Sequence, residues 1–156
     1  MKRRILLLVA LLASGFACAD MQPFVSGSLK KIERQHQGKP FILAFWSATC
    51  THCPAELKTL GELTRNNPKL DVVLVAADTL AEVPELEHLA RDYGVGKQAR
   101  WVFADAQPER LRYDIDRRWY GELPRTYLYD ARHQRVGRSG VMPREQLEQW
   151  VAEHVK

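Results

Sequence analysis

Two cysteines separated by two residues are the most distinctive chemical feature of the sequence. Cys50 and Cys53 lie in the segment SATCTHCPAE, residues 47–56. Such a pair can be half of a metal site, a structural disulfide, or a dithiol that cycles between reduced and oxidised forms. The three interpretations are distinguished by the residues around the pair and by the predicted strand and helix that carry it.

A structural zinc site normally has four ligands, supplied by a second Cys or His pair at regular spacing. This chain has no such second pair, because its other histidines are scattered: His36, His88, His133 and His154. We therefore expect no metal at Cys50 and Cys53. His52 lies between them and leaves a copper-handling alternative open, since thiolates are soft ligands for Cu(I).

A purely structural disulfide between Cys50 and Cys53 is the weaker alternative. In the chain-entropy model its stabilising effect grows with the closed loop, and this loop holds only about four residues. A cycling dithiol is the remaining interpretation, because C-x-x-C beside a strand–helix–strand pattern is itself a redox signature.

The pair lies where a predicted strand passes into a predicted helix. Residues 41–46 form a continuous apolar run, typical of a strand buried on both faces. Leu57, Leu60 and Leu63 then repeat at helical spacing. Further strands are predicted at 72–77, 101–103, 126–129 and 135–139, and further helices at 29–37, at 84–93, around 111–115 and from 143. The alternation predicts an α/β sandwich with one mixed sheet.

The predicted helix has Cys50 at its start and Cys53 inside its first turn. Free N–H groups and partial positive charge at a helix start favour a thiolate, and a cysteine there can have a pKa of about 3.5 to 7.5. Cys50 is therefore the candidate nucleophile and Cys53 the candidate resolving thiol. Glu56 lies on the same helix face as Cys53. It is either a partly buried proton acceptor or a solvent-facing surface residue.

The N-terminus has the pattern of a secretory signal peptide. Basic residues 2–4 precede an apolar run at 5–13, and Ala17 to Ala19 fits a small-x-small cleavage site. We expect a signal peptide over residues 1–19 and a single domain over 20–156. Cys50 and Cys53 are then the only thiols of an exported protein, where disulfides can persist. A lipoprotein signal at Cys18 and an uncleaved membrane anchor are the alternatives.

The charge of the chain indicates no nucleic-acid or membrane-surface partner. The sequence has 23 basic and 19 acidic residues. Cleavage would remove three basic residues and no acidic one, which leaves a nearly neutral domain. No block of Lys and Arg is then left to bind nucleic acid or an anionic surface.

Two segments carry a resemblance to the thioredoxin superfamily, and more narrowly to the exported TlpA-like thiol-disulfide oxidoreductases. They are FILAFWSATCTHCPAEL (41–57) and ELPRTYLYD (122–130). Phe45 and Trp46 match the aromatic pair before the attacking cysteine, and Pro124 matches a cis-proline before a core strand. The resemblance covers about residues 38–155. It implies a thioredoxin fold, a central mixed sheet flanked by helices, with a TlpA-like central insert at about 81–119.

The resemblance also implies an activity and a set of site residues. It implies a periplasmic enzyme that exchanges thiols and disulfides with other proteins. Cys50 attacks, Cys53 resolves and Glu56 passes a proton. The residues implied in substrate binding or tuning are Trp46, Thr51, His52, Leu123 and Pro124. Without the cysteines, Pro124 would be an ordinary trans proline that opens an edge strand.

The partners and direction of the reaction follow from the same resemblance. It implies no organic cofactor and a membrane-embedded thiol carrier as electron donor. We expect a monomer. The chain has no room for a separate dimerisation domain of the kind found in disulfide isomerases. Ala44 stands where thioredoxins carry an aspartate, which Glu56 could partly replace. A reductase of protein disulfides is predicted; the alternatives are a disulfide-forming oxidant, favoured by His52, and a copper-handling thiol chaperone.

Overall fold

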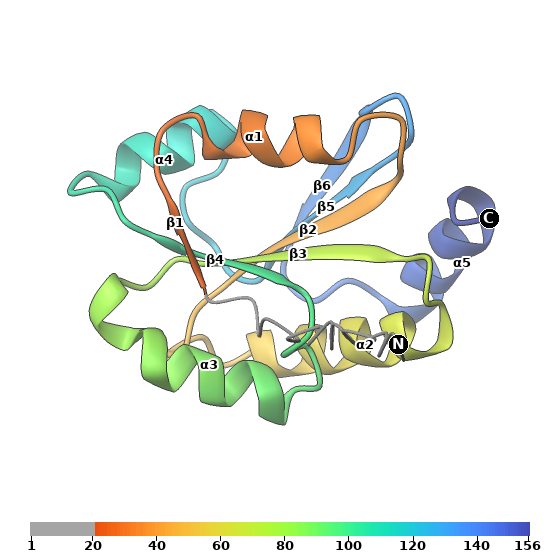
Figure 1. The fold of residues 1–156 in the computed structure, drawn as a ribbon, viewed down its shortest axis with the longest axis horizontal. Coiled ribbons are helices and arrows are strands. Elements are labelled where there is room, and N and C mark those ends of the chain that lie inside the picture. The colour runs from red at the N-terminus through yellow and green to blue at the C-terminus, as the bar shows by residue number, and fades with distance from the viewer. Residues whose placement is uncertain (1–20) are drawn as a thin grey trace, which may run out of the picture.

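The computed structural model describes residues 21–156 as a six-stranded mixed sheet with helices on both faces (Figure 1). The strands are β1 (Gln22–Phe24), β2 (Phe41–Trp46), β3 (Asp71–Ala76), β4 (Ala99–Phe103), β5 (Arg125–Tyr129) and β6 (Arg135–Ser139). The helices are α1 (Ser28–Gln35), α2 (Cys53–Asn66), α3 (Val83–Asp92), α4 (Pro108–Ile115) and α5 (Arg144–His154), with a 3-10 turn η1 (Leu80–Glu82). The predicted α/β sandwich with one mixed sheet is confirmed. The predicted signal peptide lies outside the described residues.

Strand β2 lies inside the sheet and determines where the cysteine-bearing segment leaves it. The strand order is β1-β4-β3-β2-β5-β6, with β2 parallel to β3 and antiparallel to β5. Trp46 and Ala76 are register partners at the carboxyl ends of β2 and β3. The N–H of Ala77 also donates to the carbonyl of Trp46 at 2.8 Å. The segments after β2 and β3 therefore leave the same edge of the sheet side by side.

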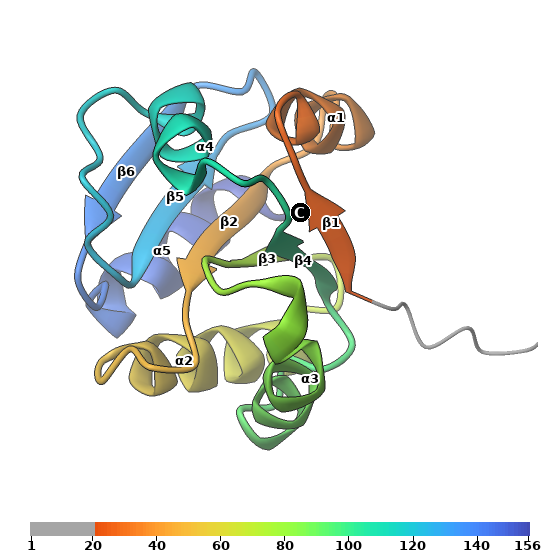
Figure 2. The same ribbon diagram turned by 90° about the vertical axis from the view of Figure 1, so that its left-hand side faces the viewer.

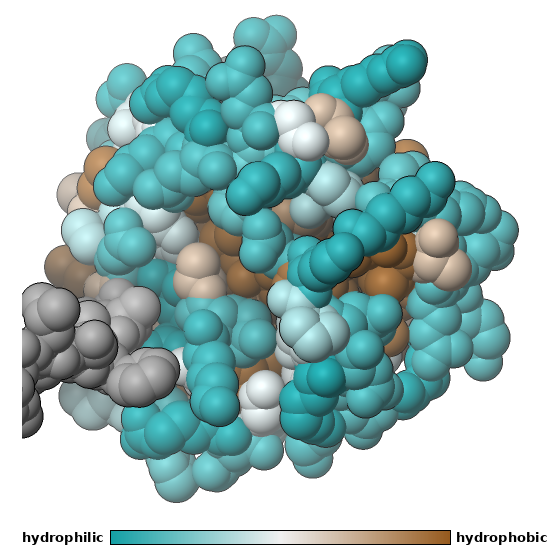
Figure 3. All heavy atoms as spheres, turned by 45° about the vertical axis from the view of Figure 1, so that its right-hand side comes forward, coloured by the Kyte–Doolittle hydropathy of each residue, from teal (hydrophilic) through white to brown (hydrophobic). Residues whose placement is uncertain are grey.

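The apolar residues of β2 serve two separate cores, which explains why the run is continuous. Ile42, Ala44 and Trp46 face the core that α2, α3 and α5 cover. Phe41, Leu43 and Phe45 face the opposite core, which contains Ile32 of α1 and Leu111 and Ile115 of α4. Figure 2 shows the two layers of helices above and below the sheet. On the face drawn in Figure 3, hydrophilic side chains cover most of the surface and hydrophobic ones show in the hollows between them.

Strand β1 was not predicted from the sequence. It has only three residues and includes Pro23, which cannot donate a ladder hydrogen bond. It pairs with β4 at the edge of the sheet, where a proline is tolerated. Its position depends on pairing with β4, about 80 residues later in the sequence, so no local pattern predicts it.

The segment expected as an insert, residues 81–119, contributes α3, β4 and α4. Strand β4 lies between β3 and β1, so this segment is part of the sheet. Arg100 of β4 is buried and pairs with Glu87 of α3 at 3.0 Å, which joins the strand to its helix. Helix α2 approaches α3 closely at Gly61, where a Cβ would lie 2.8 Å from the carbonyl oxygen of Tyr93.

Candidate active site

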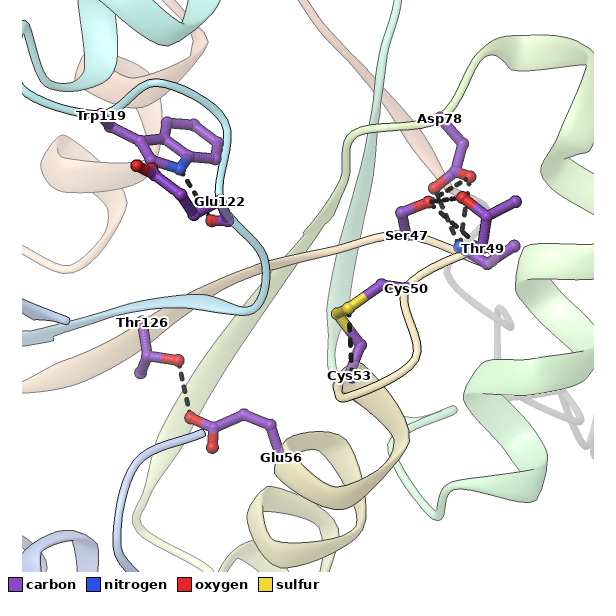
Figure 4. Close-up of a disulfide and its surroundings, with 10 residues drawn as sticks. Ser47, Thr49, Cys50, Cys53, Glu56, Asp78, Trp119, Glu122 and Thr126 are labelled. Atoms are coloured by element: carbon purple, nitrogen blue, oxygen red, sulfur yellow. Dashed lines mark hydrogen bonds between the residues drawn. A yellow bond between two sulfur atoms is a disulfide. The ribbon is translucent and has the colours of Figure 1, made fainter. Parts of the chain in front are cut away.

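Cys50 and Cys53 form a disulfide at the start of α2 (Figure 4). The sequence prediction that Cys50 lies at the helix start is wrong by three residues: α2 begins at Cys53, and Cys50 lies on the preceding turn. Pro54 marks this boundary, because a proline suits the first turn of a helix, where its missing N–H is not needed. The N–H of Cys53 nevertheless donates to the Cys50 sulfur at 3.1 Å.

The two sulfur atoms differ in burial. Cys53 is fully buried in the core between α2 and the sheet, whereas Cys50 is only half-buried. A partner can therefore approach Cys50 and not Cys53. This asymmetry suits the roles that the sequence predicts, with Cys50 attacking and Cys53 resolving, although those roles stay predictions.

Glu56 is fully buried, so a solvent-facing surface residue is excluded. Its Oε1 accepts a hydrogen bond from the Thr126 hydroxyl at 2.7 Å, and its Oε2 accepts one from the Met142 N–H at 2.9 Å. Burial raises the pKa of Glu56, and these two hydrogen bonds and the charge of Arg138 oppose the rise. The pKa of the Glu56 carboxyl is thus higher than that of an exposed glutamate.

The Glu56 carboxyl turns toward β5 in Figure 4, and not toward the disulfide. Thr126, its partner, is the cross-strand neighbour of Ala44 on β2. A buried carboxyl therefore lies near the strand position where the family resemblance implies an aspartate. The small side chain of Ala44 is itself buried in the same core.

Leu123 and Pro124 lie at the entry to β5. The peptide bond between them is cis, and Pro124 is buried. Gly140, just beyond β6, donates its N–H to the Pro124 carbonyl at 2.8 Å. Leu123 is half-buried and packs against the same core as Cys50, so the structure brings this turn to the disulfide end of the molecule.

The remaining predicted site residues differ in burial: Trp46 is buried, whereas Thr51 and His52 are exposed. Trp46 is buried beside the cysteines and makes an edge contact with Tyr93, with ring centroids 6.4 Å apart. Its indole N–H has no hydrogen-bond partner among the described residues. Thr51 and His52 are exposed, and His52 precedes α2 without capping it through its side chain.

Sequence reasoning missed Asp78, which follows β3 and is almost buried. Its carboxylate accepts hydrogen bonds from the Ser47 hydroxyl at 2.9 Å and from the Ala48 N–H at 3.2 Å. Burial raises the pKa of Asp78, and these hydrogen bonds oppose the rise. An acidic residue directly after a buried strand beside β2 is a signal that could have found it, because both strands end at one edge.

Residues 21–156 lack the features of two other kinds of site, a membrane-spanning helix and a metal centre. Within residues 21–156 there is no helix of the length and apolarity needed to cross a membrane. In the same part of the chain, no cluster of three or more His, Cys, Asp or Glu side chains is placed to hold a metal ion.

Neither a protein-family model nor a curated protein matches the sequence. Solved structures do resemble it. A secreted Mycobacterium tuberculosis disulfide oxidoreductase homologous to E. coli DsbE has a TM-score of 0.62 at 24% identity, over 77% of this chain and 85% of that chain. MTB dsbF, in its mixed oxidized and reduced forms, has a TM-score of 0.62 at 22% identity, over 77% and 84%.

A third similar structure is that of a thioredoxin-family protein. The thiol:disulfide interchange protein of the thioredoxin family from Chlorobium tepidum TLS has a TM-score of 0.63 at 14% identity, over 80% of this chain and 85% of that chain. At these identities the likeness concerns the fold. Together with the mixed sheet and the disulfide at the start of α2, it shows that the chain has the thioredoxin fold.

Proposed function

We propose that this chain is a thiol-disulfide oxidoreductase that exchanges thiols and disulfides with other proteins. One observation carries the proposal: the half-buried Cys50 is bonded to the fully buried Cys53, and its sulfur accepts the Cys53 N–H. The names of the similar structures, a disulfide oxidoreductase and a thiol:disulfide interchange protein, support the same activity. A structural disulfide that closes so short a loop would add little stability.

The reaction with a disulfide substrate takes two steps. The Cys50 thiolate attacks one substrate sulfur, a mixed disulfide forms, and the other substrate sulfur leaves as a thiolate and takes up a proton. Cys53 then loses its proton and attacks the Cys50 sulfur, which releases the second substrate thiol. The substrate gains two electrons, and the chain ends in the disulfide form that the structure shows.

Glu56 is the proposed acceptor of the Cys53 proton. It lies one turn along α2 from Cys53, and burial raises its pKa toward that of a thiol. A better match of the two pKa values makes the proton transfer less unfavourable. Because the carboxyl faces Thr126, the proton reaches it through a side-chain rotation or a water molecule.

The proposed direction is reduction of protein disulfides in the periplasm, with electrons from a membrane thiol carrier. The Cys53 N–H, which meets the Cys50 sulfur in the disulfide, favours a Cys50 thiolate, whereas a negative charge on Glu56, one turn along α2 from Cys53, opposes it. We therefore expect a potential of about −180 to −240 mV, between those of thioredoxin and DsbA. The name of a secreted disulfide oxidoreductase among the similar structures supports an exported location.

Trapping of mixed disulfides tests this function. Cys53→Ser leaves Cys50 free to attack but removes the resolving thiol, so substrate proteins should stay bonded to Cys50. Cys50→Ser is the matched control and should trap nothing. If both variants capture the same proteins, or if the reduced wild-type chain leaves protein disulfides intact, the proposed exchange activity is wrong.

A further inference from the structure

Asp78 lies outside the exchange chemistry and contacts the turn that carries Cys50. It is 9% exposed. Its Oδ1 accepts hydrogen bonds from the Ser47 hydroxyl and the Ala48 N–H, and its Oδ2 lies 3.3 Å from the same N–H. Figure 4 shows the carboxylate facing this segment, and not the sulfur atoms. Both oxygens are thus used on the two residues that open the turn.

Ser47 passes this contact on to the rest of the turn. Its hydroxyl donates to Asp78, so its oxygen is left to accept the Thr49 N–H at 3.2 Å. Its carbonyl accepts the Cys50 N–H, also at 3.2 Å. Asp78 therefore orients Ser47 through the side-chain hydroxyl, and the Ser47 carbonyl accepts the hydrogen bond that completes the turn to Cys50.

The position of Cys50 makes this turn important. Cys50 is three residues before α2 begins, so the helix itself does not hold it. Its sulfur nevertheless receives the N–H of Cys53, in the region where a helix start favours a thiolate. The turn between β2 and α2 has to place the sulfur there.

We propose that Asp78 is a positioning residue, whose carboxylate holds the turn from Ser47 to Cys50 so that the Cys50 sulfur meets the N–H of Cys53. The proposal rests on the proposed function, because it takes Cys50 as the attacking thiol. The role is geometric. The negative charge of Asp78 acts in the opposite sense, since a nearby carboxylate disfavours a thiolate.

Two substitutions separate geometry from charge. In Asp78→Asn, the side-chain oxygen can still accept from Ser47 and Ala48 while the charge is lost, so the pKa of Cys50 should stay the same or fall. In Asp78→Ala the acceptor oxygen and the charge are both lost, so the pKa of Cys50 should be higher than in Asp78→Asn, which lacks the charge alone. A rise of about one unit would lower the fraction of Cys50 present as thiolate about tenfold at a pH well below the wild-type pKa. Attack would slow by less than tenfold, because a thiolate of higher pKa is a stronger nucleophile.

The measurement is the pH dependence of alkylation of the reduced chain by iodoacetamide, with the modified cysteine identified by mass spectrometry. Asp105→Asn is the charge control. Asp105 lines the same hollow as Asp78, but its carboxylate accepts from the Gln107 N–H and makes no hydrogen bond to the Ser47–Cys50 turn. This variant should match the wild-type chain.

Ser47→Ala breaks the same relay one step later. Because Ser47→Ala keeps the Asp78 charge, it should raise the pKa of Cys50 above the wild-type value. Adding Ser47→Ala to Asp78→Ala should give no further rise. Circular dichroism checks the fold; if Asp78→Ala does not fold, Ser47→Ala alone decides. A Cys50 pKa that is unchanged in Ser47→Ala, or equal in Asp78→Ala and Asp78→Asn, overturns the proposal.

This test is independent of the test of the exchange activity. Alkylation uses no protein substrate, so a negative result for Asp78 leaves mixed-disulfide trapping by Cys53→Ser unaffected. A wild-type chain without exchange activity would overturn the proposed function, and the alkylation profiles would still report how the turn places Cys50.

Discussion

Thr126 of β5 donates a hydrogen bond to Glu56 of α2 at 2.7 Å, across 70 positions of the sequence. Glu56 lies one turn after Cys53, and Thr126 lies two residues after Pro124. The bond therefore joins α2, which carries Cys53, to β5, which follows Pro124. Met142 adds a third segment, because its N–H donates to the other oxygen of the same carboxyl.

Loss of the Thr126 hydroxyl should destabilise the fold at neutral pH. Thr126→Val leaves Glu56 Oε1 buried without this donor, which should cost about 1–3 kcal/mol of the free energy of unfolding. Thr126→Ser keeps a hydroxyl and is the matched control. Urea unfolding of the three chains at pH 7 measures the difference. Equal stability of the Val and wild-type chains would show that the bond contributes nothing.

The raised pKa of Glu56 predicts how stability depends on pH. The folded chain holds the Glu56 proton more tightly than the unfolded chain, so the stabilising contribution is complete below the unfolded pKa and is lost as the pH rises through the folded pKa. Glu56→Gln should remove this loss, because a glutamine side chain does not titrate in this pH range. It can still accept from the Met142 N–H and donate to the Thr126 hydroxyl, so the contacts of the site are kept. Urea unfolding at pH 4 and pH 7 should then show a smaller fall for the variant. An identical fall in both chains would exclude Glu56 as its source.

The same substitution should slow disulfide exchange. Glu56→Gln removes the proposed proton acceptor for Cys53, and general acid–base catalysis typically contributes about 10²- to 10⁴-fold. The pH–rate profile of reduction of a protein disulfide should change shape near neutral pH. Glu62→Gln, on the same helix but paired with Arg144, is the control and should match wild type. A Glu56→Gln profile that overlays wild type would make Glu56 a structural residue only.

The two cysteines should differ in reactivity when reduced. Cys50 should react with iodoacetamide with a midpoint clearly below the free-cysteine value of about 8.5, because the Cys53 N–H, which donates to the Cys50 sulfur in the disulfide, should stabilise the thiolate in the reduced chain. Cys53 should react slowly, because it is fully buried. Peptide mapping after a short reaction at several pH values distinguishes them. Equal labelling of both thiols with a midpoint near 8.5 would contradict the assigned roles.

His52 should raise the reduction potential. It is exposed beside Cys50, where a protonated imidazole would favour the thiolate and hence the reduced state. His52→Ala should lower the potential by about 30 mV or more. His88→Ala, which removes an exposed histidine of α3 that pairs with Asp92 and lies outside the site, is the control. Equilibration with glutathione buffers, followed by Trp46 fluorescence, gives the potentials. An unchanged potential in His52→Ala would remove His52 from the mechanism. A wild-type potential near −120 mV would indicate an oxidant.

Much of the fold could be predicted because it depends on local patterns. The continuous apolar run of β2 predicts burial on both faces, and the leucine spacing of α2 predicts one buried helical face. The hairpin of β5 and β6 followed from two short runs of β-forming residues close together in the chain. These features need no knowledge of distant neighbours. Strand β1 does need it, since it pairs only with β4.

The sequence by itself determined that the site can form a disulfide, because the spacing of Cys50 and Cys53 allows one in any fold that turns there. Only the tertiary structure decided what surrounds it. Asp78 reaches Ser47 because β2 and β3 are parallel neighbours that end at one edge. Glu56 meets Thr126 because β5 lies antiparallel to β2 under α2. Strand order and register create both contacts, and these arise from the packing of the whole chain, which no short stretch of residues records.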